Sequence, residues 1–356
     1  MLASSAQGEP AKPKRYRGPP ILRFGLFLIV QAIVLLVLVE ILARIFNPMG
    51  ISFYPETARY LDTMIKKMPI GYTNRPNLRG RYFGTEVRIN SLGLRDREVP
   101  MPAPENEFRI LVLGDSIPFG IGVDYEDSIV HVLELVANQR EAGDRHYRTI
   151  NMGVPSYNTE QELIQLESLG MSLEPDLVLL FFVVNDLESK MWVFEKRASI
   201  LADLAQRSYA GSFLFTLSRR LNERVGGKKP RIDASGDWET DPKWVRLDRS
   251  LTTMYQLCES ADVPFVVFFL GNQGVRQMQM VRSVGKREHF AVWKLSRAAD
   301  ARWPGDVSLY RNSAVDGHAN KDGCLAYGTL IYEKLAEKGI LAQPEDTPQS
   351  KLTEGR

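Results

Sequence analysis

The sequence predicts a three-layer α/β/α sandwich with a parallel sheet, preceded by one N-terminal transmembrane helix. Three observations favour this class: short apolar runs alternate with stretches of helical periodicity, the 356 residues are 44% hydrophobic and 25% charged, and one long uncharged apolar stretch stands near the N-terminus. Continuous apolar runs are typical of strands buried on both faces, and helices between such strands make the sheet parallel.

Residues 21–46 are predicted to cross a membrane once. Their central part from Phe24 to Val39 carries no charge, and at ~1.5 Å per residue the stretch spans a hydrocarbon core of roughly 30 Å. Basic residues crowd its N-terminal flank, namely Lys12, Lys14, Arg15, Arg17 and Arg23. The positive-inside rule therefore predicts an inner (cytoplasmic) membrane protein with a cytoplasmic N-terminus and, in a bacterium, a periplasmic main domain.

Two alternatives to this anchor are a cleaved signal peptide and a buried core helix. A signal peptide has a shorter apolar centre followed by a small-x-small site, and only Ala43 in "EILARIFNPMG" offers a partial match. The length, basic flank and terminal position argue against a core helix. We expect an uncleaved anchor, with the membrane as a partner.

The segments outside the main domain differ in composition. Residues 1–20, which are basic, and residues 342–356 lack apolar periodicity and are predicted to be disordered tails. Residues 47–107 form a lead-in segment that we expect to pack on the main domain. Within it, "GRYFGTEVRIN" (80–90) alternates between apolar and polar residues and predicts a hairpin.

The main domain is predicted to cover residues 108–341. Five apolar runs are expected to be strands, the last more weakly than the others: 108–114, 147–153, 176–184, 263–271 and 306–310. An insertion at 187–245 interrupts this rhythm. Its place after a central strand predicts that it covers the carboxyl edge of the sheet, as a lid or as a dimer or membrane contact.

Charge and cysteine content exclude several classes of protein. With 45 basic and 43 acidic residues the net charge is +2, so nothing favours nucleic acid as a partner. Cys258 and Cys324 have no metal-binding spacing. We expect two buried thiols, with one mutual disulfide as the alternative. The oligomeric state is left open.

The stretch "ILVLGDSIPFG" (110–120) ends its apolar run in Gly-Asp-Ser. Ser116 therefore follows the carboxyl end of the first strand, where α/β sheets present reactive groups. A lone motif of this kind is usually a turn or a helix cap. A serine nucleophile also needs a base.

Of the four histidines, His318 alone lacks an ordinary surface or core position; the others are His131, His146 and His289. His318 lies in "AVDGHANKDG", a polar loop before the last helix, at the same predicted edge as Ser116. Asp316 precedes it by two positions, which in an extended stretch places both side chains on one face. A carboxylate there is suited to orient the imidazole, although capping roles are the alternative.

Two further strand ends carry residues suited to bind an oxyanion. Gly153 ends the second strand, where its backbone N–H is expected to face Ser116, and Asn185 ends the third with a side-chain amide. Each residue is common in turns, but the four segments together supply every group that acyl transfer requires.

The set Gly114-Asp115-Ser116, Gly153, Asn185-Asp186 and Asp316/His318 resembles the four blocks of the SGNH (GDSL-type) hydrolase superfamily, over residues 108–335. The resemblance implies a flavodoxin-like fold and hydrolysis or transfer of an ester acyl group without metal or cofactor. It also implies that Ser116 is the nucleophile, His318 the base and Asp316 its orienting group. The oxyanion hole would be formed by Ser116, Gly153 and Asn185.

One spacing departs from that family, because only Gly317 separates Asp316 from His318 where most members have two residues. Asp322 is a less favoured substitute for Asp316. The leading hypothesis is an esterase or O-acyltransferase acting on an O-acetylated envelope glycan or exopolysaccharide. A lipid esterase resembling lysophospholipases, with "SFLFTL" (212–217) near its site, and a non-catalytic envelope binding or assembly protein are the alternatives.

Overall fold

The computed structural model describes residues 20–140, 144–190, 203, 206–224, 240–270, 275–295 and 310–341. Its central sheet has the strand order β6-β5-β7-β8-β9, and every neighbouring pair is parallel. The strands are β5 Glu107–Gly114, β6 His146–Asn151, β7 Leu177–Phe182, β8 Phe265–Phe269 and β9 Ala291–Lys294. In chain order this is 2-1-3-4-5, the order of flavodoxin-like sheets. The predicted α/β class is confirmed.

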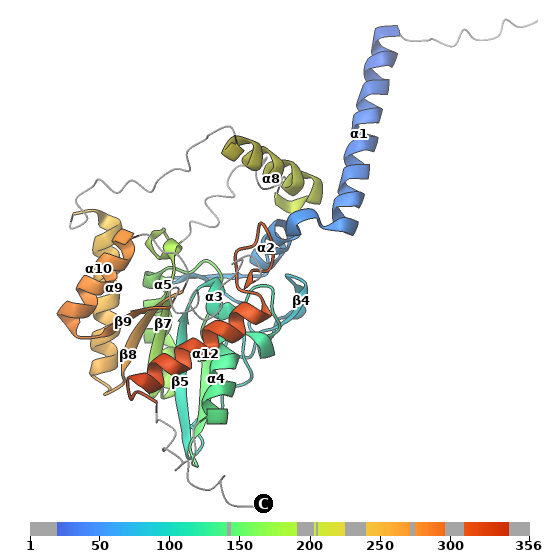
Figure 1. The fold of residues 1–356 in the computed structure, drawn as a ribbon. Helices are drawn as coiled ribbons and strands as arrows, with labels where there is room; N and C mark the ends of the chain where they lie inside the picture. The colour runs from blue at the N-terminus through green and yellow to red at the C-terminus, as the bar shows by residue number, and fades with distance from the viewer. Residues whose placement is uncertain are drawn as a thin grey trace, which may run out of the picture.

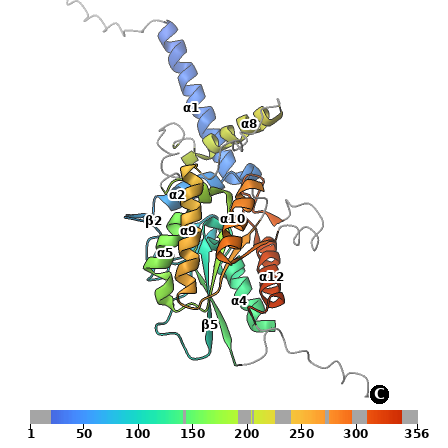
Figure 2. The same ribbon diagram turned by 90° about the vertical axis from the view of Figure 1, so that its left-hand side faces the viewer.

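Helices cover both faces of this sheet (Figure 2). One face carries α4 Ile129–Arg140 and α12 Lys321–Glu337, and the other carries α5 Thr159–Ser168, α9 Pro242–Glu259 and α10 Val275–Glu288. The strand β5 alternates between the two cores: Ile110 and Val112 face the first, Leu111 and Leu113 the second. All four side chains are fully buried, as a central strand between two helical layers requires.

The fifth strand differs from the one expected. The run 306–310 lies almost wholly outside the described residues, whereas residues 291–294, "AVWK", form the edge strand β9. Its four residues are only partly buried and follow α10 almost directly. A short edge strand needs no continuous apolar run, so the pattern that marked the central strands did not mark this one.

The lead-in segment forms small elements beside the sheet. They are α2 Phe53–Leu61, the antiparallel pair β1 Ile65–Lys67 and β2 Gly71–Thr73, and the hairpin β3 Arg79–Tyr82 with β4 Thr85–Arg88. The hairpin lies where the alternation over 80–90 predicted it. Short 3-10 turns complete the described chain: η1 Pro48–Gly50, η2 Tyr125–Asp127, η3 Gly170–Leu173 and η4 Val184–Leu187.

The first helix, α1 Pro20–Phe46, projects away from the sheet (Figure 1). Within the described residues it is the one helix long and apolar enough to cross a membrane, over Ile21–Phe46, and nearly all of its surface is exposed. The predicted tails, 1–20 and 342–356, lie outside the described residues except for Pro20, which begins α1. Residues 191–202, 204–205 and 225–239 of the insertion also lie outside them. The described part of the insertion includes α8 Tyr209–Arg224.

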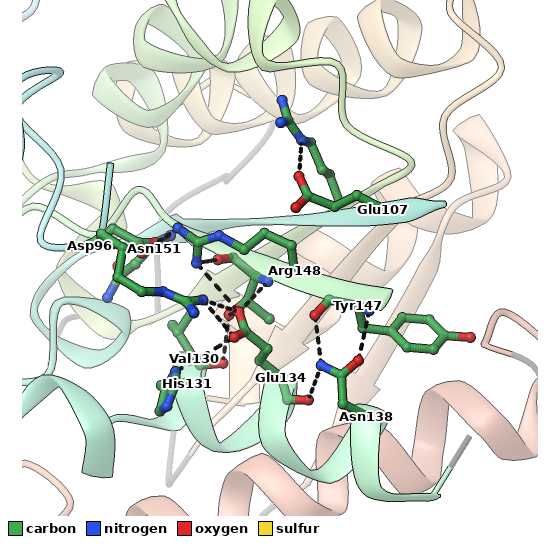
Figure 3. Close-up of polar contacts among 12 residues, drawn as sticks. Asp96, Glu107, Val130, His131, Glu134, Asn138, Tyr147, Arg148 and Asn151 are labelled. Atoms are coloured by element: carbon green, nitrogen blue, oxygen red, sulfur yellow. Dashed lines mark hydrogen bonds and ion pairs between the residues drawn. The ribbon is translucent and has the colours of Figure 1, made fainter. Parts of the chain in front are cut away.

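A buried ionic network fastens the lead-in segment to the sheet (Figure 3). Arg148 of β6 lies between Asp96 of the lead-in, at 2.8 Å, and Glu134 of α4, at 3.4 Å. All three side chains are at most 5% exposed. Glu134 also accepts the Thr149 N–H at 2.9 Å, and Arg97 closes the network on Glu134 at 2.5 Å. Buried charges are tolerated only with such partners.

The two cysteines lie on opposite faces of the sheet. Cys258 belongs to α9 in one core and Cys324 to α12 in the other, and both are buried and unpaired. The sheet between them rules out the mutual disulfide. Burial raises the pKa of both thiols to about 12, so they stay protonated at neutral pH.

The network at Arg148 predicts a large effect of one substitution. Asp96→Ala leaves a buried guanidinium short of a partner and is expected to destabilise the protein by about 3–5 kcal/mol. Urea unfolding of the detergent-solubilised chain measures this. Glu86→Ala breaks the exposed Arg88–Glu86 pair and is the matched control, expected to leave the midpoint unchanged. Equal effects of the two substitutions would contradict the argument.

Candidate active site

The turn after β5 places Ser116 at the carboxyl edge of the sheet. The strand ends at Gly114, with φ +148°, and Ser116 begins the short helix α3 Ser116–Phe119. A Cβ at Gly114 would lie 2.7 Å from Pro118 Cγ, so the close turn requires glycine. Asp115 caps α3, because its Oδ1 accepts the Ile117 N–H at 3.1 Å. Ser116 remains partly exposed at this edge.

A tight loop before α12 presents Asp316 and His318. The Asn312 N–H donates to the His318 carbonyl at 3.0 Å, and Ser313 Oγ accepts the Asp316 N–H at 3.0 Å. Asn312 Nδ2 also donates to Asp316 Oδ2 at 3.0 Å. These bonds fix the carboxylate while its other oxygen faces the imidazole.

Three side chains from the two segments form a continuous hydrogen-bond chain. His318 Nε2 lies 2.7 Å from Ser116 Oγ, and His318 Nδ1 lies 2.5 Å from Asp316 Oδ1. A carboxylate only accepts, so Nδ1 carries the proton and Nε2 is left as the acceptor for the serine hydroxyl. The structure therefore brings together the predicted Ser116, Asp316 and His318, with Asp316 rather than Asp322 on the imidazole.

The electrostatics of this chain raise the pKa of the His318 imidazole. Burial by itself lowers the pKa of His318, but the hydrogen bond and negative charge of Asp316 outweigh burial and raise it above the ordinary value. Asp115 adds a smaller effect in the same direction. Burial raises the pKa of Asp115 itself, against the opposing effect of the hydrogen bond from the Ile117 N–H. Ser116 Oγ also lies 3.1 Å from Asp115 Oδ2, which competes for the hydroxyl proton.

Two of the expected oxyanion donors belong to the same edge of the sheet as Ser116. The Ser116 N–H opens α3, where a helix supplies it with no internal acceptor. Asn185 lies in η4, directly after β7; its amide donates to the Tyr157 carbonyl at 3.1 Å, and its side chain also bonds Asp115. The strand ends at β5 and β7 thus bring both groups to one place.

Gly153 differs from the expectation. Its N–H, which we expected to face Ser116, donates to Asn151 Oδ1 at 2.9 Å. A Cβ at Gly153 would lie 2.2 Å from the Phe119 N atom, so glycine is needed here for close packing against α3. The spacing along the chain located the correct strand end but did not reveal that this donor is already engaged.

Arg95 of the lead-in supports the turn after α3. It is buried and donates to the carbonyls of Phe119 at 2.9 Å, of Gly120, and of Val123 at 2.7 Å. Burial lowers its pKa to about 10, which still leaves it charged at neutral pH. The positive charge of Arg95 binds three carbonyl oxygens and so holds the backbone that follows Ser116 in place.

Two buried carboxyl groups lie behind Asn185. Glu162 of α5 and Asp186 of η4 are nearly inaccessible, and burial together with nearby negative charge raises the pKa of each well above its ordinary value. Asp186 Oδ2 accepts the Val183 N–H at 2.5 Å, which fixes the turn that presents Asn185. Neither Glu162 oxygen has a hydrogen-bond partner among the described residues. The pair was not anticipated from the sequence.

Other titratable groups lie apart from this edge. Of the remaining histidines, His131 is in α4, His146 begins β6 at the opposite edge and His289 follows α10. A cavity of about 680 Å³ lies between the β3–β4 hairpin and η2, lined by side chains of both charges such as Arg88 and Glu98. No residue of the Ser116 chain lines it.

Comparison with known proteins gives similar folds at low identity. No family model and no curated protein sequence matches the chain. Solved structures that match include an esterase from Pseudoalteromonas (14% identity, TM-score 0.38, 65% of this chain and 97% of that one). A family 3 carbohydrate esterase from Clostridium thermocellum (12%, 0.41, 66% and 99%) and a lipase/acylhydrolase from Enterococcus faecalis (16%, 0.35, 65% and 96%) also match.

The Glu162–Asp186 pair predicts how stability depends on pH. Both carboxyls have a raised pKa in the folded chain, so their contribution is fully present below the unfolded values, 4.5 for Glu162 and 3.8 for Asp186, and is lost as the pH rises through the folded values. Glu162→Gln removes the ionisable group. We expect its melting temperature, relative to the native chain, to rise between pH 4 and pH 8, measured by thermal unfolding at both pH values. A constant difference would contradict the assignment.

Proposed function

We propose that the protein is a serine-dependent enzyme that hydrolyses or transfers an ester acyl group through an acyl-Ser116 intermediate. The observation that carries the proposal is the continuous bond chain Ser116 Oγ to His318 Nε2 and His318 Nδ1 to Asp316 Oδ1, at 2.7 and 2.5 Å. These are the contacts by which a base activates a nucleophile and a carboxylate orients the base.

In the first step Ser116 Oγ attacks the ester carbonyl carbon and its proton passes to His318 Nε2. The Nδ1–H stays donated to Asp316, whose negative charge stabilises the imidazolium that forms. Collapse of the tetrahedral intermediate breaks the bond to the alcohol oxygen, which takes the proton from Nε2. The acyl group is then carried as an ester on Ser116.

The negative charge of the tetrahedral intermediate needs donors on its other side. The Ser116 N–H and the Asn185 side-chain amide are the candidates, since the first opens α3 at the serine itself and the second bonds the neighbouring Asp115. Such preorganised donors stabilise charge that develops only in the transition state. Asn185 would exchange its bond to Tyr157 for one to the oxyanion.

The second step determines whether the enzyme is a hydrolase or a transferase. His318 Nε2 removes a proton from water or from an acceptor hydroxyl, which attacks the acyl carbon and releases Ser116. We place the site outside the cytoplasm on an α1 anchor, in keeping with the basic N-terminal flank and the exposed apolar surface of α1. A tethered site favours esters at the cell surface, either O-acetyl groups of a glycan or a lipid ester.

A fluorophosphonate probe tests the nucleophile directly. We expect the detergent-solubilised chain to form one adduct, located on Ser116 by mass spectrometry, and Ser116→Ala and His318→Ala each to abolish labelling. Ser116→Ala combined with His318→Ala should be no more inactive towards a chromogenic ester than either alone, because the groups act as a unit. Ser172→Ala, an exposed serine on η3, is the control and should label normally. Unchanged labelling of Ser116→Ala would refute the proposal.

The raised pKa of His318 predicts the pH profile of the reaction. The base form is needed, so kcat/KM is expected to fall on the acid side with a midpoint above the ordinary histidine value of 6.5. Asp316→Asn removes the charge that raises this pKa. It should lower kcat/KM by up to about 10⁴-fold and move the acid midpoint to lower pH. Lost activity with an unmoved midpoint would instead indicate a merely structural Asp316.

A further inference from the structure

The helix α8 exposes a stripe of apolar side chains and buries two polar ones. Leu214, Leu217 and Leu221 follow the spacing i, i+3, i+7 and are 51%, 41% and 51% exposed. Ser212 and Thr216 are on the opposite side of the helix and are buried. A helix on a water-soluble domain has the reverse arrangement. The exposed stripe therefore indicates a surface made for an apolar environment.

The start of α8 is fastened to the end of α1. Glu40 of α1 accepts the Ala210 N–H at 2.7 Å and the Ser208 hydroxyl at 2.9 Å. Arg44 lies over the Tyr209 ring, 4.7 Å from its centre, and is itself paired with Glu40 at 2.8 Å. These contacts join α1 to α8. Cleavage of the chain after Ala43 would therefore remove Glu40, which binds the start of α8.

The level of these contacts corresponds to the boundary of a bilayer. The uncharged part of α1, Phe24–Val39, covers about 24 Å, most of a hydrocarbon core. Glu40 is the first charge after it, and Figures 1 and 2 both show α8 running across the direction of α1 from this end. If α1 crosses the membrane, α8 lies along its surface.

We propose that α8 is an interfacial helix whose partner is the lipid bilayer itself, with Leu214, Leu217 and Leu221 in the boundary between headgroups and acyl chains. An amphipathic helix with this pattern binds the interface by burying its apolar face. Continuity with α1 selects the bilayer over a second protein, because the same membrane that receives Ile41, Leu42, Ile45 and Phe46, all exposed on α1, lies next to the stripe.

This placement carries a consequence for the site, which rests on the proposed function. Phe215 of α8 packs edge-on against Tyr54 at 5.8 Å between ring centres, Tyr54 lies 5.6 Å from Phe53, and Phe53 lies 5.7 Å from the His318 ring. Three ring contacts thus connect the membrane-facing helix with the base. The edge of the sheet that bears Ser116 faces the bilayer rather than the bulk solvent.

Depth-dependent fluorescence quenching tests the placement of α8. The full chain is reconstituted in vesicles of phosphatidylcholine and phosphatidylglycerol after Leu217→Cys is labelled with a polarity-sensitive dye; Cys258 and Cys324 are buried and stay unlabelled. We expect blue-shifted emission that brominated lipids quench. Ser172→Cys, on exposed η3, is the control and should report water. Leu221→Cys repeats the measurement in case Leu217→Cys perturbs folding.

Two results would overturn the proposal. Water-like emission that brominated lipids leave unquenched at both Leu217→Cys and Leu221→Cys would show that the stripe does not contact the bilayer. Energy transfer between labelled copies, without lipid quenching, would assign the stripe to self-association. Fluorophosphonate labelling is measured on the same samples. Lipid quenching without any labelling of Ser116 would refute the proposed function and leave the membrane contact in place.

Discussion

Two adjacent buried charges, Arg95 and Asp96, hold the turn on which the candidate site depends. Arg95 binds the carbonyls that follow α3, while Asp96 accepts the Asn151 N–H at 2.7 Å. The Asn151 side chain in turn donates to the Pro118 carbonyl at 2.6 Å, within α3 itself. Because buried charges require partners, this segment and the sheet are held in one relative position. The lead-in segment thus helps to position the candidate site.

The strands that the sequence predicted best are those buried on both faces of the sheet. Strands β5, β7 and β8 are apolar on both faces and appear as continuous runs, whereas β9 is half buried and was missed. Strand ends located Ser116 and Asn185 correctly because parallel strands bring their carboxyl ends to one edge. Which N–H is free cannot be read from spacing, as Gly153 shows, since its partner Asn151 is decided by local geometry.

The short spacing of Asp316 and His318 lets one carboxylate oxygen bind both the backbone and the ring of the histidine. With Gly317 alone between them, Asp316 Oδ1 accepts both the backbone N–H of His318 at 3.1 Å and its ring Nδ1. One oxygen thus fixes the backbone and the imidazole together, while Asn312 holds the other oxygen. A carboxylate that accepts from three donors is held rigidly. His318 needs such a rigid partner because its Nε2 must reach the Ser116 hydroxyl at 2.7 Å.

The separation of Cys258 and Cys324 by the sheet means that no covalent cross-link takes part in folding. Their protonated, buried thiols are poor nucleophiles for disulfide exchange, so oxidants and thiol exchange enzymes have little to act on. The domain therefore has the same covalent structure in a reducing and in an oxidising compartment. Folding of this chain therefore needs no oxidase in either kind of compartment.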